Sequence, residues 1–389
     1  MSIRTYSALK KSGTVLIEKQ DDPITAQKAA LLFTDPEFTL STKHLSEVPS
    51  AFRELDSCIA RGYFAAGYVT YEAGWAFEDR LRSQCAETYP FPLIWFGLYR
   101  SCEQVDMDRI IDCYDLPLKR CHPHLSVMRR DYYEKDIMAV KDLIEKGEIY
   151  QMNYTWQSEL SQIIDPLALF FELRRSHPVP YSAWIVTDEI TVLSLSPELF
   201  FSKNGDEITV RPMKGTMPRG NSPLEDRARR QALETSEKNR AENLMIVDLL
   251  RNDLNRICEI GSVCVPRLFT VEEYPSLFQM TSTIKGTLSE KIFFAEIFSS
   301  LFPCGSVTGA PKVRAMELIR DIEKGPRGIY TGSIGFISPN GDALFNVAIR
   351  TISIGEKGAR LGAGGGIVWD SDPGSEYDEC LLKMKFVAG

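Results

Sequence analysis

The sequence lacks a long hydrophobic run. No segment approaches the roughly 20 consecutive apolar residues that a membrane-spanning helix needs. Its first residues, 1–14, are too polar for a secretory signal peptide, which requires an apolar centre. These two absences argue against a membrane or secreted protein, and we therefore expect a cytoplasmic one.

An excess of positive charge is also missing. The chain has 45 Lys and Arg residues against 53 Asp and Glu residues, which gives a net charge of −8. A surface that binds nucleic acid usually carries net positive charge, so nucleic acid is not expected as a partner. A small anionic substrate is still compatible with this composition, because a local basic pocket is enough to bind it.

Paired cysteines are absent as well. The nine cysteines are odd in number, scattered along the chain and never arranged as C-x-x-C, so we expect reduced thiols without a disulfide framework. Cys121, His122 and His124 form the densest metal-like cluster, but no second ligand pair stands at zinc-site spacing. We interpret that cluster as part of a polar connecting loop.

What is present indicates a folded globular protein. With 389 residues, 44% hydrophobic and 25% charged, the composition excludes intrinsic disorder and low-complexity architectures. A proline- and basic-rich run over residues 116–124 is the best candidate boundary. We predict an N-terminal α/β region over residues 1–120 that packs on a larger core over residues 121–389.

The predicted strands follow one another without alternating helices. Strand-like runs cover residues 181–186, 190–195, 199–203, 208–211, 329–337 and 343–354. Helices are predicted over residues 44–60, 131–146, 223–235 and 236–250, with Ser222 and Ser236 as capping residues of the last two. This order favours an α+β protein with antiparallel sheets over a doubly wound parallel fold.

Histidine is missing after His177, so acid–base chemistry in the later part of the chain must rely on Glu, Asp, Lys or Tyr. Asn204-Gly205 predicts a hairpin that brings Glu198 alongside residues 211–214. A two-residue loop at Asn204-Gly205 would place Glu198 and Lys214 on opposite faces, whereas a three-residue loop would place them on one face. If Glu198 and Lys214 belong to one site, the hairpin is predicted to have the three-residue loop. The alternative is that Glu198 is a solvated carboxylate at a strand edge.

Lys214 lies in residues 211–220, a segment with so many prolines and glycines that we expect an irregular, rigid loop. A lysine becomes nucleophilic when its amine is neutral, which burial or a neighbouring cation such as Arg219 would promote. The competing interpretation is a surface lysine in a turn. Residues 303–312 form a second small-residue loop before a helix that begins near Pro311; it is either an anion site or a tight turn.

Near the C-terminus, the glycines of residues 362–366 allow a ligand to approach the backbone closely. Glu376, Glu379 and Lys383 follow at spacings of three and four, so they share one face of a helix. Together with Glu242 from another helix, these carboxylates would supply oxygen ligands suited to Mg²⁺. A solvated Glu/Lys helical face is the alternative.

Several of these motifs together resemble the chorismate-utilising enzymes, and within that family the aminodeoxychorismate branch. The resembling stretches are residues 196–198, 211–220, 240–253, 302–312, 327–332, 345–351 and 362–379. They occur in order over roughly two thirds of the chain, between about residues 128 and 385. The resemblance implies an α/β sandwich in which two large antiparallel sheets pack face to face, with helices outside and the active site between the sheets.

The resemblance also implies roles for individual residues. Lys214 would be the nucleophile, in a position where anthranilate synthases carry alanine, and Glu198 the general acid and base at the C4 hydroxyl of chorismate. Glu242 and Glu379 would hold Mg²⁺, with Glu376 nearby. The substrate-binding set would be Tyr330, Arg350 and the backbone at Gly364, with Gly215, Thr216 and Lys383 lining the same pocket.

The implied reaction converts chorismate and ammonia to 4-amino-4-deoxychorismate, on the route to p-aminobenzoate and folate. The chain shows no glutaminase nucleophile motif, so a glutamine amidotransferase subunit is expected to supply the ammonia. Gln279, Met217 and Asn239 depart from the family pattern, and we expect these departures to affect metal and substrate binding. The alternatives are an anthranilate synthase component I, an isochorismate or salicylate synthase, and a non-catalytic chorismate-binding regulatory subunit.

Overall fold

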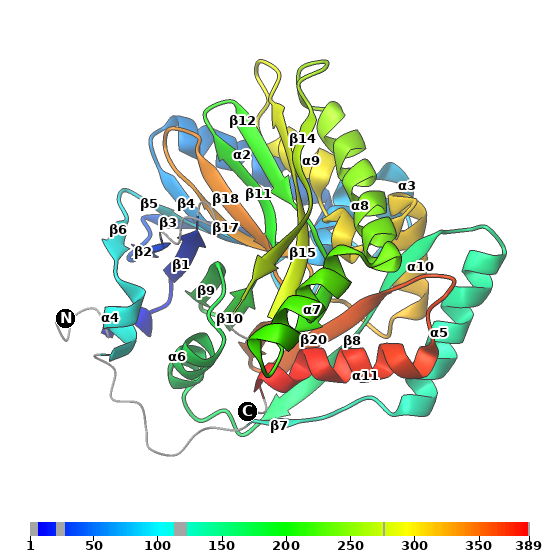
Figure 1. Cartoon of the computed structure of the whole chain (residues 1–389). Helices are drawn as coiled ribbons and strands as arrows, with labels where there is room; N and C mark the ends of the chain where they lie inside the picture. Colours follow the sequence, from blue (N-terminus) through cyan, green and yellow to red (C-terminus); the bar gives the residue numbers. More distant parts are fainter. Residues whose placement is uncertain (1–6, 21–27, 113–122, 275–276, 388–389) are drawn as a thin grey trace.

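Two antiparallel β-sheets form the centre of the molecule (Figure 1). The computed structural model describes residues 7–20, 28–112, 123–274 and 277–387. Cys121, His122 and most of the predicted boundary over residues 116–124 lie outside these ranges. Within the described ranges each sheet has ten strands, and the predicted α+β sandwich is confirmed.

The first sheet contains, in spatial order, β16 (Gly309–Ala310), β8 (Gln151–Ser161), β20 (Gly358–Ile367), β19 (Thr351–Gly355), β10 (Ile190–Ser196), β9 (Tyr181–Val186), β1 (Thr14–Gln20), β2 (Lys28–Phe33) and β6 (Glu103–Val105), with β7 (His124–Leu125) beside β8. The second contains β13 (Met213–Pro218), β15 (Leu277–Thr287), β12 (Glu207–Arg211), β11 (Leu199–Asn204), β18 (Ala343–Val347), β17 (Ser333–Ile337), β4 (Phe64–Val69), β5 (Ile94–Tyr99) and β3 (Phe38–Thr42), with β14 (Cys264–Glu273) beside β15. The N-terminal strands therefore extend both sheets, through the pairs β1–β9 and β4–β17.

The two sheets pack face to face through large apolar side chains. The ring of Phe33 in β2 lies 6.1 Å from that of Phe336 in β17 and 5.3 Å from that of Tyr99 in β5, centroid to centroid. Ile185 and Tyr68 are fully buried in the same inter-sheet cluster. Alternation of side chains along each strand directs one set into this core and the other set towards the covering helices.

Helices cover the outer faces. The helices of the structure are α2 (Val48–Ala60), α3 (Asp79–Arg82), α4 (Met107–Asp112), α5 (Arg130–Glu145), α6 (Pro166–Ser176), α7 (Pro223–Glu234), α8 (Glu237–Asn255), α9 (Phe294–Leu301), α10 (Lys312–Ile322) and α11 (Pro373–Met384), with short 3₁₀ turns η1 (Leu45–Glu47), η2 (Tyr71–Phe77), η3 (Gly305–Val307) and η4 (Lys385–Val387). In α9, Phe298 packs against Phe52 of α2 and Phe345 of β18, at centroid distances of 4.6 and 5.1 Å. None of the helices in the described part of the chain combines the length and apolar character needed to cross a bilayer.

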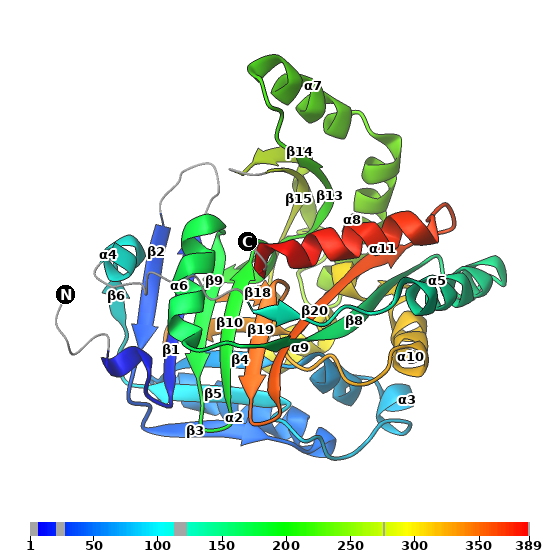
Figure 2. The ribbon, with the colours of Figure 1, turned by 90° about the horizontal axis from the view of Figure 1, so that it is seen from below.

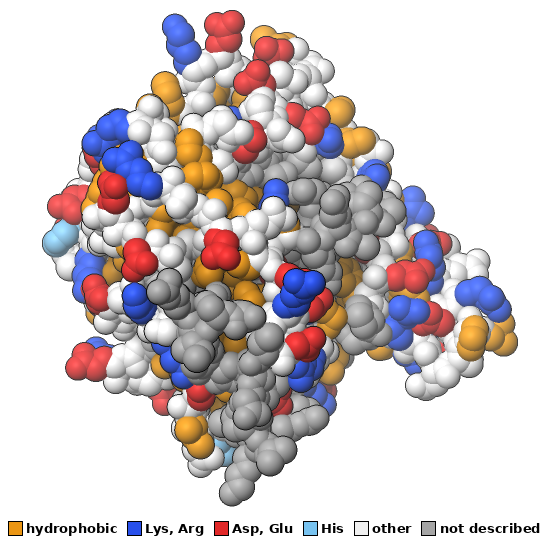
Figure 3. Space-filling view, turned by 90° about the vertical axis from the view of Figure 1, so that its left-hand side faces the viewer, with side chains coloured by type: hydrophobic (Ala, Val, Ile, Leu, Met, Phe, Trp, Pro, Cys, Tyr) orange, Lys and Arg blue, Asp and Glu red, His pale blue; other side chains and the backbone are white. Residues whose placement is uncertain are grey.

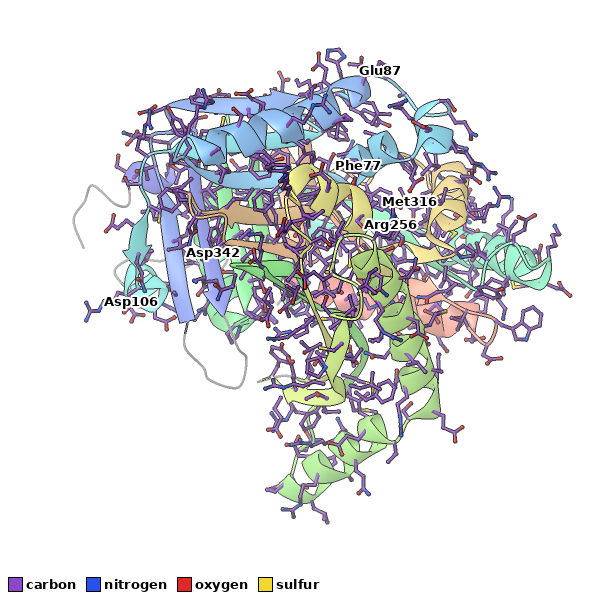
Figure 4. All side chains as sticks on the ribbon, turned by 90° about the horizontal axis from the view of Figure 1, so that it is seen from above. Phe77, Glu87, Asp106, Arg256, Met316 and Asp342 are labelled. Carbon is purple, nitrogen blue, oxygen red and sulfur yellow. The ribbon has the colours of Figure 1, made fainter. Side chains whose placement is uncertain are left out.

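The helix predictions hold closely. Ser222 and Ser236 cap α7 and α8 by accepting hydrogen bonds from backbone N–H groups three residues on, and α8 continues five residues beyond the predicted end at Leu250. Figures 2 and 4 show that α7, the start of α8 and the ends of β13 to β15 project from the sandwich as a lobe. On the face formed by the N-terminal strands, charged side chains of both signs are interspersed (Figure 3).

One predicted strand divides. Residues 343–354 form β18 and β19, which belong to different sheets. The chain crosses between the sheets at residues 348–350, where Arg350 has a φ of +50°. Hydrophobicity is continuous across this crossing because both strands are buried, so the pattern does not reveal the break.

Candidate active site

Glu198 and Lys214 reach the same site through a hairpin whose turn differs from the predicted one. The loop has two residues, 205–206, so the predicted three-residue loop is wrong. A β-bulge within β11 then shifts the register by one residue, so that Leu199 pairs with Arg211. This is the register that a three-residue loop would have produced, and the bulge therefore restores the shared face.

Lys214 lies in β13, so the expectation of an irregular loop over residues 211–220 is wrong. The strand pairs with β15, and its register shifts between Met213 and Thr216. Gly215, inside this irregularity, has a φ of +85°, a conformation that residues with a β-carbon rarely adopt. The bulge thus keeps strand pairing while it sets the direction of the Lys214 side chain.

The Lys214 amine is partly buried and faces the loop over residues 303–312. Its Nζ donates a hydrogen bond to the carbonyl oxygen of Ser306 at 3.2 Å. Burial lowers the pKa of Lys214, although Glu242 and Glu198 favour its charged form. A lysine with a lowered pKa holds a larger share of neutral, nucleophilic amine at physiological pH.

Glu198 is the most buried carboxylate of the cluster, with 3% of the residue exposed. Burial raises the pKa of its carboxyl group to about 7, against the lowering effects of a hydrogen bond from Ser306 and of the Lys214 charge. Among the described residues, no hydrogen-bond partner reaches its Oε1. A carboxyl group that titrates near neutrality and keeps one oxygen free is suited to transfer a proton to or from a bound ligand.

The predicted face of α11 is present and carries alternating charges. Lys383 donates to Glu379 Oε1 at 2.8 Å and to the carbonyl oxygen of Gly364 at 2.9 Å. Glu376 accepts a hydrogen bond from the Ser371 hydroxyl at 2.7 Å and is 9% exposed. This face therefore lies along β20, beside the glycine-rich strand that the sequence suggested as a ligand contact.

The charges of α8 and α11 interact across the site. Glu242 of α8 is partly buried, and burial raises its pKa, as does the charge of Glu379. The Lys383 ammonium lowers the pKa of Glu379, whereas burial raises that of Glu376. The structure thus brings Lys214, Glu198 and the three predicted metal-binding glutamates into one electrostatic cluster.

These carboxylates fit a hard divalent cation in donor type, since Mg²⁺ prefers oxygen ligands and binds few protein groups. Among the described residues, no three Asp, Glu, His or Cys side chains already converge at metal-binding distance. Lysines balance part of the acidic charge instead: Lys383 is paired with Glu379, and Lys238 favours the ionised forms of Glu242 and Glu376. Glu242, Glu376 and Glu379 are the residues that would hold the cation.

Two predicted substrate ligands occupy other parts of the site. Tyr330 is 8% exposed, and its ring packs against Gly362, where a β-carbon would come within 2.2 Å of it. Arg350 borders a small cavity together with His177, Pro197 and Gln279. Within the described ranges, no hydrogen bond or ion pair is found for its guanidinium group, and burial lowers its pKa. Arg350 therefore offers an unbalanced positive charge beyond the main cluster.

Gln279 connects the Arg350 cavity to β13. Its Nε2 donates to the carbonyl oxygen of Gly215 at 2.9 Å, and its Oε1 accepts from the hydroxyl of Thr216 at the same distance. Asn239 packs against Gly215, where a β-carbon would lie 2.9 Å from its side chain. Two of the three departures from the family pattern thus contact the segment that follows Lys214.

Sequence reasoning missed three polar residues of the cluster. Ser306 lies in the small-residue loop but was not singled out, and Lys238 stands one turn before Glu242 on α8. Gln151 begins β8, and a β-carbon on Gly366 would lie 2.5 Å from its Nε2 and 3.2 Å from Nζ of Lys214. Its Oε1 is buried without a partner among the described residues. A lone glutamine at a strand start carries no spacing signal.

The chain is similar to proteins of known family. A family model described as chorismate binding enzyme matches residues 117–389. A probable chloroplastic aminodeoxychorismate synthase of Oryza sativa is 45% identical over 260 residues, which are 66% of this chain and 29% of that protein. Component 1 of the Escherichia coli aminodeoxychorismate synthase is 40% identical over 67% of this chain and 57% of its own length. The chain thus spans less than two thirds of these relatives.

Other similarities extend over nearly the whole chain. Anthranilate synthase component 1 of Saccharolobus solfataricus is 32% identical over 98% of this chain and 88% of its own length. The crystal structure of anthranilate synthase component I from Streptococcus pneumoniae has a TM-score of 0.80, with 24% identity, over 94% of this chain and 93% of that one. The menaquinone-specific isochorismate synthase of Escherichia coli has a TM-score of 0.76 at 17% identity, over 100% and 92% of the two chains. The solved structures support the same sandwich fold.

Proposed function

Because this chain belongs to the chorismate-binding enzymes, we propose that it aminates chorismate to 4-amino-4-deoxychorismate through a covalent adduct of Lys214. The observation that carries the proposal is the meeting of Lys214, whose pKa burial lowers, and Glu198, whose pKa burial raises to about 7, at Ser306. An amine that is readily neutral beside an acid that is readily protonated is the pair that a nucleophilic displacement requires.

In the proposed reaction, the neutral amine of Lys214 bonds to C2 of chorismate while both ring double bonds shift, from C1=C2 to C1=C6 and from C5=C6 to C4=C5, and the C4–O bond breaks. Glu198 gives its proton to the departing hydroxyl, which leaves as water. Ammonia then bonds to C4, both double bonds shift back and the C2–N bond to Lys214 breaks. Lys214 leaves as a neutral amine, and the one surplus proton, on the new ammonium group at C4, returns to Glu198. Two easier displacements thus replace one difficult step.

The remaining residues bind and orient the substrate. Arg350 would pair with one carboxylate of chorismate, and Lys383, Tyr330 and the Gly364 backbone would surround the rest of the ligand. A Mg²⁺ ion held by Glu242, Glu376 and Glu379 would neutralise a substrate carboxylate. Several relatives are named component 1, which supports a separate amidotransferase component as the source of ammonia.

A second candidate is anthranilate synthesis, which the similarity to the Saccharolobus protein over 98% of the chain favours. The two activities differ in their products. Incubating the purified protein with chorismate, Mg²⁺ and ammonium salts, and identifying the product by liquid chromatography and mass spectrometry, separates them. We expect aminodeoxychorismate; anthranilate would overturn the proposal in favour of the second candidate.

The covalent step has its own test. Intact-protein mass spectrometry of the chorismate-treated enzyme without ammonia should show an adduct of chorismate less one water, and Lys214→Ala should abolish it. Lys285→Ala is the matched control, because Lys285 lies on β15 of the same sheet and pairs with Glu207 at the surface. Full activity in Lys214→Ala would end the nucleophile assignment.

A further inference from the structure

The N-terminal region is hydrogen-bonded to the segment that leads to Tyr330. Glu72 lies in η2 and is 3% exposed. Its carboxylate accepts hydrogen bonds from the backbone N–H of Arg327 at 2.6 Å and of Gly328 at 3.0 Å. The N–H of Tyr71 in turn donates to the carbonyl oxygen of Gly328 at 2.9 Å. Three hydrogen bonds therefore join η2 to the chain just before Tyr330.

The side chain of Arg327 is buried at the same junction, with 2% of it exposed. Its Nε and one terminal nitrogen form a two-point pair with the carboxylate of Glu323, at 2.8 and 2.6 Å. Its guanidinium carbon lies 4.4 Å from the ring centroid of Tyr71. A planar guanidinium held by a bidentate partner and an aromatic ring has little freedom to move.

The remaining donors of Arg327 reach two segments that carry the candidate site. One terminal nitrogen donates to the carbonyl oxygen of Val307 at 2.7 Å, directly after Ser306. The other donates to the carbonyl oxygen of Asn153 in β8 at 2.6 Å, two residues after Gln151. The side chain of Arg327 thus links the segments of Ser306 and Gln151 to its own segment, which continues to Tyr330.

From these contacts we infer that Glu72 is a positioning residue of the chorismate site, acting through Arg327 on the segments of Tyr330, Ser306 and Gln151. The inference rests on the proposed function. Glu72 lies outside residues 117–389, which the family model matches, so the N-terminal region contributes directly to the geometry of the site. Without its carboxylate, two buried backbone N–H groups would lose their acceptors, and the Tyr330 segment would relax.

A matched pair of variants tests this role. Glu72→Gln keeps the size of the side chain but turns one acceptor into a donor that faces a backbone N–H. Asp56→Asn makes the same change in α2, where Asp56 accepts from the N–H groups of Phe294 and Ala295, at 2.9 and 3.3 Å, and contacts no residue of the site. Both variants lose comparable contacts between the N-terminal region and the core.

Steady-state kinetics and thermal unfolding of the full chain distinguish the outcomes. We expect Glu72→Gln to raise the KM for chorismate about tenfold with kcat changed less than about threefold, because one buried N–H group before Tyr330 loses its acceptor and Tyr330 belongs to the proposed binding site. Asp56→Asn should lower the melting temperature similarly and leave KM unchanged. An unchanged KM in Glu72→Gln, or an equal rise in Asp56→Asn, would overturn the inference alone. A wild-type protein that forms no aminated product would overturn the proposed function, and the positioning role with it.

Discussion

The two sides of the candidate site balance their charges differently. On the side formed by β11 and β13, burial raises the pKa of Glu198 and lowers that of Lys214. On the side formed by α11, Glu379 and Lys383 have 57% and 41% of their side chains exposed and pair with each other at 2.8 Å. Burial therefore suits the first side to the proton and covalent chemistry that we propose, whereas pairing keeps the second side charged.

This difference follows from where each group is carried. The first side projects from strands that enter the inter-sheet core, so desolvation dominates its electrostatics. The second lies on the face of α11 that runs along β20, where Glu379 and Lys383 are still about half exposed and the opposite charge of the pair dominates. Changes on the buried side should accordingly affect kcat, and changes on the exposed side should affect binding constants.

The largest effect is expected on the buried side. Glu198→Gln removes the proton donor and should reduce kcat by about 10²–10⁴-fold with a small change in KM. In the wild type, kcat should fall as the pH rises through the Glu198 pKa of about 7, because the protonated acid is depleted, and this limb should vanish in the variant. The measurement is kcat between pH 5.5 and 8.5.

The control for this prediction is Glu207→Gln, at the far end of the same hairpin, where Glu207 pairs with Lys285 on the surface. It should leave kcat and its pH dependence unchanged. If kcat still falls with rising pH in Glu198→Gln, another group is the acid, and the proposed difference between the two sides is wrong.

A smaller effect is expected on the exposed side. Glu379→Gln should raise the Mg²⁺ concentration for half-maximal binding about tenfold, because one anionic oxygen ligand becomes neutral. Titration calorimetry of Mg²⁺ with the protein reports this without turnover. Chelation with EDTA should abolish wild-type activity, and added Mg²⁺ should restore it.

Asp378→Asn is the matched change on the adjacent residue of α11, where Asp378 pairs with Arg130 away from the site. It should leave Mg²⁺ binding as in the wild type. Equal weakening in both variants would indicate a general effect of charge, and undiminished Mg²⁺ binding in Glu379→Gln would remove Glu379 from the metal ligands.

The smallest effect concerns stability. Burial raises the Glu198 pKa from the ordinary 4.5 to about 7, so the folded protein holds this proton more tightly than the unfolded chain. Its ionisation therefore lowers the free energy of unfolding as pH rises through this interval, by at most about 3 kcal/mol. Urea unfolding should show Glu198→Gln gaining stability relative to wild type between pH 4.5 and 7.5. A difference that does not vary with pH would contradict the buried acid.

Local signals in the sequence predicted a large part of the site. The spacing of Glu376, Glu379 and Lys383 predicts one helical face, and the structure places them along β20. Ser222 and Ser236 mark the starts of α7 and α8, since a cap depends only on nearby backbone groups. The motif resemblance to the chorismate-utilising enzymes is confirmed by the family match.

Other features depended on partners far away in the chain. The segment over residues 211–220 contains the strand β13 because β15 supplies its hydrogen bonds, which no local pattern shows. The bulge in β11 and the crossing at Arg350 are likewise set by the sheets that their strands join. Gln151 and Glu72 were not predicted, because their roles depend on the groups that they contact in the folded protein.

The sequence by itself determined which residue types are available, which of them share a helical face, and where capped helices begin, because these properties depend on neighbours within a few positions. Only the tertiary structure decided which groups became buried together. Desolvation and Coulomb interactions act through space, so the proton affinities of Glu198 and Lys214, and the contact of Glu72 with the Tyr330 segment, arose when the two sheets packed.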